Sequence, residues 1–222
     1  MILTVVDHAS NHVPPEVDLG IEPSLLRSHI AWDIGAAALA RALAFPAHLA
    51  SVSRLVIDVN REEDSPGLIP SVSDGVVIPG NIEVDRKARL AAYYRPYHQM
   101  LARRIASARP HLLLSLHSFT PQLTEKQEQR PWHIGVLYNN DDRAARVALP
   151  MLEATGLCVG DQLPYSGKLL NASMNRHGEG TGTPYLGLEV RQDLIGDEAG
   201  VARIAALLRP AIETVGARFR SP

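Results

Sequence analysis

The first residues of the chain, Ile2-Leu-Thr-Val-Val-Asp-His8, combine a short apolar run with two polar residues. An unbroken run of apolar and β-branched side chains is typical of a buried strand, so the pattern predicts a strand over 2–6. His8 would lie just beyond its end. The run His111-Leu-Leu-Leu-Ser-Leu116 leads into His117 in the same way. The two histidines therefore follow two predicted strands.

Further along the chain, predicted strands alternate with predicted helices. We expect strands over 54–59, 133–138, 157–161 and 185–190, and helices over 23–30, 33–43, 82–107, 143–154 and 199–215. This alternation is typical of a single α/β domain, here 1–222, in which helices cover a mostly parallel sheet. The segments 62–81 and 167–183 are rich in Gly, Pro, Ser or Asn and are predicted to be loops, the first of them forming a lid or rim.

Charge and cysteine content limit the classes of partner. The 222 residues include 22 basic and 24 acidic side chains, evenly mixed, which argues against nucleic acid or an acidic membrane surface as a partner and favours a small molecule. A single cysteine and an N-terminus without a basic, apolar leader pattern favour the cytoplasm. No run approaches the roughly 20 apolar residues of a membrane span. The sequence indicates no oligomeric state.

A metal site is predicted where the strands end, because parallel strands present their carboxyl ends at one edge of a sheet. Two imidazoles and one carboxylate form a common catalytic zinc site, so His8 and His117 are the first candidate ligands. Asp33 is the favoured third ligand, although it could instead cap the helix predicted over 33–43. His12 is the alternative, but it lies in a loop bounded by prolines.

Three further residues are candidates for binding and catalysis. Asn60 and Arg61 follow the strand predicted over 54–59, and a guanidinium beside an amide suits a substrate carboxylate. The alternative for Arg61 is an ordinary surface ion pair with Glu62 or Glu63. Glu189 lies within an apolar run, where burial would raise its pKa and suit it to general acid–base work.

Five stretches of the sequence resemble the N-formylglutamate amidohydrolase family. They are Asp7-His-Ala-Ser-Asn-His-Val-Pro14, His29-Ile-Ala-Trp-Asp-Ile-Gly35, Val59-Asn-Arg61, Leu116-His-Ser-Phe119 and Gly187-Leu-Glu-Val-Arg191. That family is similar to the aspartoacylase and succinylglutamate desuccinylase group and, more distantly, to zinc carboxypeptidases. The resemblance implies a three-layer α/β fold with a mixed, mainly parallel sheet, and hydrolysis of an amide with the help of one zinc ion or another divalent metal.

The resemblance also implies roles for individual residues. His8 and His117 match the metal histidines, Asn60 and Arg61 match the pair that binds the substrate carboxylate, and Glu189 matches the catalytic glutamate. Arg61 is also expected to help stabilise the developing oxyanion, and Arg191 to contribute to substrate binding.

The relatives carry a metal-binding glutamate three residues after the first histidine, where this chain has Asn11. The third ligand is therefore expected from Asp33, with His12 and Asn11 as alternatives.

Several functions remain compatible with the sequence. The first expectation is a cytoplasmic zinc amidohydrolase that converts N-formyl-L-glutamate to formate and glutamate. A deacylase or carboxypeptidase-like hydrolase of another N-acyl or peptide-like compound is the enzymatic alternative. The substitution at Asn11 also leaves open an inactive relative that only binds a small ligand.

Overall fold

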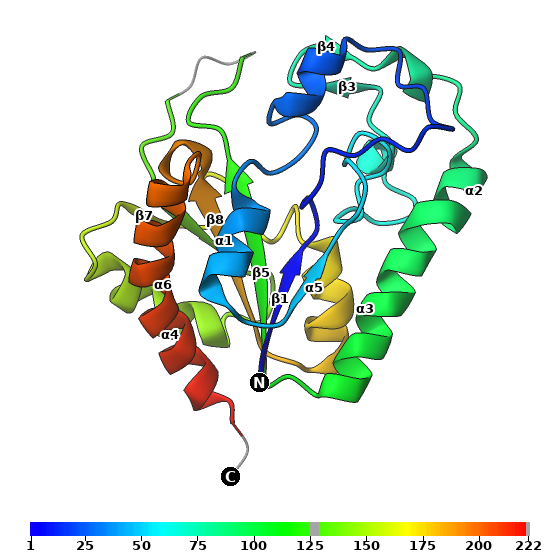
Figure 1. Ribbon diagram of the computed structural model, residues 1–222. Coiled ribbons are helices and arrows are strands. Elements are labelled where there is room, and N and C mark those ends of the chain that lie inside the picture. The colour runs from blue at the N-terminus through cyan, green and yellow to red at the C-terminus, as the bar shows by residue number, and fades with distance from the viewer. Residues whose placement is uncertain (125–128, 221–222) are drawn as a thin grey trace.

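A six-stranded mixed sheet forms the centre of the computed structural model, which describes residues 1–124 and 129–220 (Figure 1). In spatial order the strands are β2 (Ala47–Leu49), β1 (Ile2–Val6), β5 (Leu112–Phe119), β8 (Tyr185–Arg191), β6 (Ile134–Leu137) and β7 (Val159–Asp161). The first four run parallel to one another, and β6 pairs antiparallel with β8. The predicted mostly parallel sheet is therefore confirmed.

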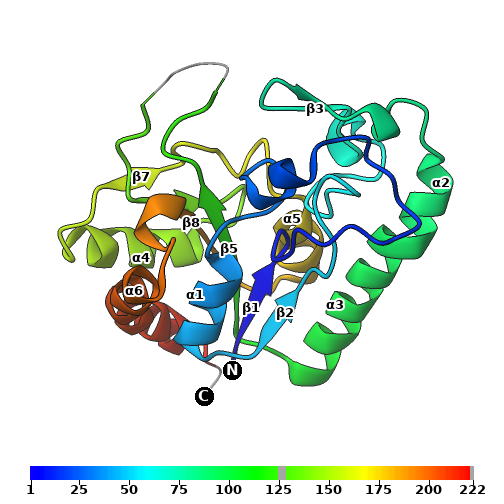
Figure 2. The same ribbon diagram turned by 45° about the horizontal axis from the view of Figure 1, so that its top comes forward.

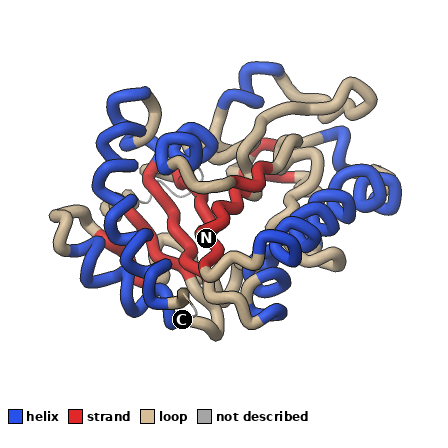
Figure 3. The backbone as a smooth tube through the Cα atoms, turned by 60° about the horizontal axis from the view of Figure 1, so that its bottom comes forward, coloured by secondary structure: helices blue, strands red, loops and turns tan. Residues whose placement is uncertain are grey.

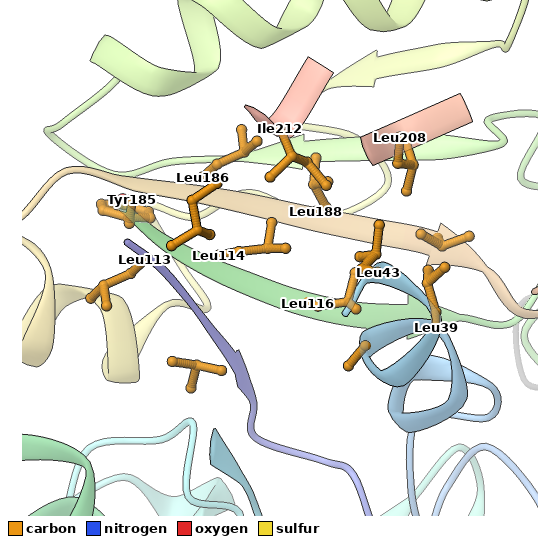
Figure 4. Packing of buried hydrophobic residues seen from close by; sticks show 14 of the residues in the cluster. Leu39, Leu43, Leu113, Leu114, Leu116, Tyr185, Leu186, Leu188, Leu208 and Ile212 are labelled. Atoms are coloured by element: carbon orange, nitrogen blue, oxygen red, sulfur yellow. The ribbon is translucent and has the colours of Figure 1, made fainter. Parts of the chain in front are cut away.

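Helices cover both faces of this sheet (Figure 3). On one face, α6 (Glu198–Arg218) packs against α1 (Ala36–Leu43) and α4 (Arg143–Glu153); on the other, α3 (Arg95–Ala108) packs against α5 (Ala172–His177). Figure 4 shows that Leu39 and Leu43 of α1 and Leu208 and Ile212 of α6 gather over Leu114, Leu116, Leu186 and Leu188 of the central strands. Alternate residues of a strand point to opposite faces, so His117 of β5 lies on the other face.

Short helices and one hairpin occupy the connections. They are 3-10 helices over Pro23–Arg27, Pro66–Leu68, Pro79–Asn81, Glu179–Thr181 and Gln192–Leu194, and a hairpin of β3 (Val72–Ser73) and β4 (Val76–Val77). The helix predicted over 82–107 is divided into α2 (Arg86–Arg89), a π-helical turn (Leu90–Tyr94) and α3. Pro96 follows the π turn and cannot donate a backbone hydrogen bond, which accounts for the break in α-helical pairing. No helix in the described part of the chain is long and apolar enough to cross a bilayer.

Two predicted elements were wrong. Residues 54–59 form no strand, because the backbone turns around Ser53, whose carbonyl and hydroxyl oxygens accept hydrogen bonds from the amides of Val56 and Leu55. The apolar side chains of this turn are buried in a hydrophobic cluster formed largely by loops, and for this reason their sequence has the pattern of a buried strand. The predicted loop over 167–183 contains α5, and strand β2 was not predicted.

The predicted rim lies where β1 and β5 end. Figure 1 shows the β3–β4 hairpin beyond that edge of the sheet. In Figure 2 the hairpin and the segment after β5 stand on opposite sides of this edge. Gly67, Pro70 and Asp74 of the segment 62–81 line a cavity there. The loop therefore forms one wall of the cavity described next.

Candidate metal centre and active site

Three buried side chains that the sequence nominated as metal ligands lie together at this edge. His8 follows β1, His117 belongs to β5, and Asp33 precedes α1. Their candidate ligand atoms all lie within 4.8 Å of one another. Asp33 Oδ2 is 2.8 Å from His117 Nδ1 and 3.4 Å from His8 Nδ1. The carboxylate oxygen thus lies between the two imidazoles.

Asp33 is held in place by contacts on both sides. Its backbone amide donates to the carbonyl oxygen of His8 at 3.0 Å, and the amide of Ser118 donates to its Oδ2 at 3.2 Å. Helix α1 begins after Gly35 without a side-chain cap, so the alternative role of Asp33 as a helix cap is wrong. Burial opposes the charge of Asp33, but His8 and His117 outweigh this effect and lower its pKa. The structure therefore presents Asp33 as an anion to the two histidines.

The alternative third ligands lie elsewhere. The Asn11 side chain donates to the carbonyl oxygen of Leu26 at 2.9 Å, and His12 is exposed. Neither is among the described residues that line the cavity. Of the three candidates, the structure brings only Asp33 to His8 and His117.

Each histidine also faces a second carboxylate. His8 Nε2 is 2.7 Å from Asp58 Oδ1, and Arg54 in turn bonds Asp58 Oδ2 at 2.7 Å. His117 Nε2 lies 3.6 Å from Asp7 Oδ2. Metal-binding histidines commonly donate their outer N–H to such a carboxylate, which directs the other ring nitrogen to the ion. Within the described residues, the buried Nδ1 of His8 has no hydrogen-bond partner.

These contacts fit a divalent cation. Two imidazole nitrogens and one carboxylate oxygen converge, with an outer carboxylate behind each ring, as in three-ligand zinc sites with an open position. The nearby carboxylates raise the pKa of His8 and of His117, although burial acts in the opposite direction and Arg54 also lowers that of His8. The site therefore favours a positive charge between the Nδ1 atoms of His8 and His117 and the Asp33 carboxylate.

Glu189 lies beside His117 on the neighbouring strand. The two residues are register partners in the parallel pair β5 and β8, and both line the cavity. Only 8% of Glu189 is exposed, and burial raises its pKa to about 7. A carboxyl group with a pKa near neutrality can both accept and return a proton at physiological pH.

Arg191 does not join this group. Its guanidinium pairs with Asp193 at 2.8 Å and donates to the carbonyl oxygens of Arg130 and Pro131. It is not among the described residues that line the cavity. The predicted role of Arg191 in substrate binding therefore has no support in the geometry, because its strand has left the cavity at that position.

Asn60 and Arg61 line the same cavity, whose volume is about 360 Å³. The Asn60 Oδ1 atom accepts a hydrogen bond from the Ser173 amide of α5, and the Arg61 Nε atom lies 3.6 Å from Asp58 Oδ2. Arg61 is partly exposed, and Glu63, one of the partners considered for it, pairs with Arg95 instead. The Arg61 guanidinium is thus placed to meet a carboxylate that enters the cavity.

Sequence reasoning missed several residues around the site. The sequence places Asp58 and Arg54 within a predicted strand and predicts no role for Asp7. Tyr165, another cavity residue, accepts a hydrogen bond from Arg130 at 2.8 Å. The available signal was the position of Asp7 next to His8 and the cluster of polar residues at 58–61. No local signal indicated Tyr165.

Comparison with known proteins identifies the family. The family model for N-formylglutamate amidohydrolase matches residues 1–196. The chain belongs to the N-formylglutamate amidohydrolase family. The resemblance seen in the sequence is therefore confirmed. The predicted reaction class, amide hydrolysis, agrees with this family. No curated protein matches the chain.

Two solved structures share its fold. A gene product of Agrobacterium tumefaciens is 35% identical, with a TM-score of 0.90 over 98% of this chain and 90% of the other. An N-formylglutamate amidohydrolase from Ralstonia eutropha JMP134 is 21% identical, with a TM-score of 0.78 over 99% of this chain and 93% of the other. At 21% identity, the similarity to the Ralstonia eutropha protein shows a shared fold alone.

Proposed function

We propose that this member of the N-formylglutamate amidohydrolase family is a zinc-dependent enzyme that cleaves the amide bond of a small N-acyl amino acid. N-formyl-L-glutamate, which would yield formate and glutamate, is the first substrate to test. The observation that carries the proposal is the convergence of His8, Asp33 and His117 beside Glu189 in one cavity. Arg61, which lines the same cavity, supplies the cation for the substrate carboxylate.

His8 Nδ1, His117 Nδ1 and an oxygen of Asp33 would hold the ion. A divalent metal at this place supplies a Lewis acid that polarises the acyl carbonyl and makes water a stronger acid. Asp58 orients the His8 imidazole through its hydrogen bond, and Asp7 faces the outer nitrogen of His117. The protein thus contributes a fixed set of donors at the end of the sheet, next to the cavity in which the substrate would lie.

Glu189 is the proposed proton carrier. It accepts a proton from the attacking water as the new bond to the acyl carbon forms, and it delivers that proton to the amide nitrogen as the carbon–nitrogen bond breaks. The products are a carboxylic acid and a free amine. The raised pKa of Glu189 suits both directions of transfer near neutral pH.

Arg61 and Asn60 are the proposed binding residues. The guanidinium of Arg61 can donate two hydrogen bonds to a carboxylate. The Asn60 side-chain oxygen accepts from the Ser173 amide, which leaves the NH2 group of Asn60 to donate to the substrate. Together they would hold the amino-acid end of the substrate, so that the acyl group points to the metal ligands. Arg61 also remains the candidate donor to the developing oxyanion.

The test measures metal content and hydrolysis on the same sample. Purified protein is stripped with a chelator, reloaded with zinc, and assayed for amine release from N-formyl, N-acetyl and N-succinyl amino acids. We expect one bound zinc per chain, activity that returns on reloading, and turnover of N-formyl-L-glutamate. Hydrolysis of N-acetyl or N-succinyl amino acids without hydrolysis of N-formyl-L-glutamate would contradict only the proposed substrate. Inactivity on the whole panel, or failure to bind zinc, would contradict the function.

A further inference from the structure

The carboxylate behind His117 is held by a tyrosine from a distant part of the chain. Asp7 is 1% exposed, and its Oδ1 accepts a hydrogen bond from the hydroxyl of Tyr97 in α3. Its Oδ2 faces His117 Nε2 at 3.6 Å. Both of these facing atoms are buried and lack a hydrogen-bond partner among the described residues. Two unsatisfied polar atoms therefore point at each other directly behind the metal site.

Two buried polar atoms in this arrangement destabilise the protein unless they form a hydrogen bond with each other. A buried donor or acceptor without a partner has lost its hydrogen bonds to water and gained none in the protein, which destabilises the folded state. An approach of roughly 0.8 Å would bring Asp7 Oδ2 and His117 Nε2 to hydrogen-bond distance. Nε2 would then carry the proton, and the lone pair of Nδ1 would face the metal position. The orientation of Asp7 consequently decides which nitrogen of His117 is available as a ligand.

Tyr97 is itself rigidly placed. Its ring lies between those of His48 and His98, with centroid distances of 4.7 Å and 5.2 Å. Burial and the neighbouring carboxylate raise the pKa of the Tyr97 hydroxyl well above its usual range, so it remains a hydrogen-bond donor. This fixed donor engages Asp7 Oδ1 and leaves Oδ2 for His117. The position of α3 is thereby coupled to the position of a metal ligand.

We propose that Tyr97 is a positioning residue for the metal site, acting through Asp7 on His117. The inference rests on the proposed function, because it requires that His117 bind the ion. It parallels the contact on the other histidine, where Arg54 holds Asp58 and Asp58 holds His8. The difference is that the residue behind Asp7 is the neutral Tyr97, whereas the residue behind Asp58 is the cation Arg54. Tyr97 therefore holds Asp7 through one hydroxyl hydrogen bond and without an opposite charge.

The test compares Tyr97→Phe with Tyr185→Phe. Tyr185 is the control because its hydroxyl, like that of Tyr97, donates to a carboxylate, here Glu179 at 3.1 Å. It also accepts from Asn171 at 2.9 Å and from the amide of Asn139 at 2.8 Å, and Tyr185 is not among the described residues that line the cavity. Zinc affinity is measured by competition with a chromophoric chelator, and the stability of the metal-free protein by urea unfolding. We expect Tyr97→Phe to weaken zinc binding about 10- to 100-fold. Tyr185→Phe should bind zinc as the natural protein does.

The following outcomes would overturn the inference. Unchanged zinc affinity in Tyr97→Phe, or an equal loss in both variants, would show that the tyrosine is only structural while the proposed function stands. Failure of the natural protein to bind zinc would remove both proposals. If Tyr97→Phe does not fold, Asp7→Asn alone is measured; it should weaken zinc binding about 10- to 100-fold, and unchanged affinity would overturn the inference. Where Tyr97→Phe folds, Asp7→Asn and Asp7→Asn/Tyr97→Phe should have equal affinities. A further loss on adding Tyr97→Phe would show that it does not act through Asp7.

Discussion

His8 Nε2 and Asp58 Oδ1 form a buried 2.7 Å hydrogen bond between residues 50 positions apart in the chain. Arg54 bonds the second oxygen of Asp58, so the carboxylate is fixed from both sides. The pairing directs the free Nδ1 of His8 to Asp33. Asp58 therefore belongs to the candidate site although it is not itself one of the proposed ligands.

Replacing Asp58 with Asn should weaken zinc binding about 10- to 100-fold, because the amide keeps the shape but loses the charge that orients His8. Chelator competition measures the effect. Asp18→Asn is the control, since Asp18 is exposed and bonds only the nearby amide of Gly20 among the hydrogen bonds found for it. Equal affinity in Asp58→Asn and the natural protein would show that His8 is oriented by other contacts.

Glu189→Gln should keep zinc and lose turnover by about 10²- to 10⁴-fold, because glutamine cannot carry the proton. Metal analysis and kcat are measured on the same preparation. His117→Ala provides the contrast, since it should lose both zinc and activity. A Glu189→Gln enzyme with normal kcat would exclude Glu189 as the proton carrier.

Arg61→Ala should raise KM for a carboxylate substrate about tenfold to a hundredfold, as expected for the loss of a charge-assisted hydrogen bond. The matching substrate with a carboxamide in place of the carboxylate should be affected much less. Arg95→Ala, which removes an exposed arginine paired with Glu63, serves as the control. Equal losses on the charged and uncharged substrates would contradict the proposed role of Arg61 in binding the substrate carboxylate.

A buried histidine pair makes stability depend on pH. His98 Nδ1 and His177 Nε2 are 2.8 Å apart, and the two rings are stacked. Burial lowers the pKa of each from 6.5 to about 4. The unfolded chain therefore binds more protons than the folded one between these values, and stability falls as the pH falls from 6.5 towards 4.

Urea unfolding at pH 8 and pH 5 should show this loss as about 2 kcal/mol for each histidine of the pair. His177→Gln should remove the contribution of one histidine, so that stability at pH 5 relative to pH 8 rises by about 2 kcal/mol compared with the natural protein. His12→Gln, at an exposed position, should leave the difference unchanged. A pH dependence in His177→Gln equal to that of the natural protein would contradict the assignment.

The central strands could be predicted from the sequence because their side chains are almost all buried. The runs at 2–6 and 112–116 are apolar except for Thr4 and Ser115, and all of their residues are buried, which is the pattern of a covered parallel strand. The same pattern at 54–59 was misleading, because a buried turn also requires apolar side chains. The difference lies in the backbone hydrogen bonds to Ser53, which no periodicity reveals.

The ligand candidates could be predicted in part for a related reason. His8 and His117 come at the ends of recognisable strands, and Asp33 lies just before a recognisable helix. Asp7 and Tyr97 meet only because α3 packs beside β1, across 90 positions of sequence. The ion pair of Arg191 with Asp193, outside the cavity, could not be predicted because it depends on how the chain turns after β8.

The register between β5 and β8 places His117 directly opposite Glu189. Their separation is consequently set by the hydrogen-bond ladder of the sheet, in which neighbouring strands lie about 4.8 Å apart. Loops elsewhere can be lengthened or shortened without altering it. An insertion of one residue within either strand would instead turn one of the two side chains to the opposite face. Natural variation in chain length among active relatives should therefore be confined to the loops and spare these two strands.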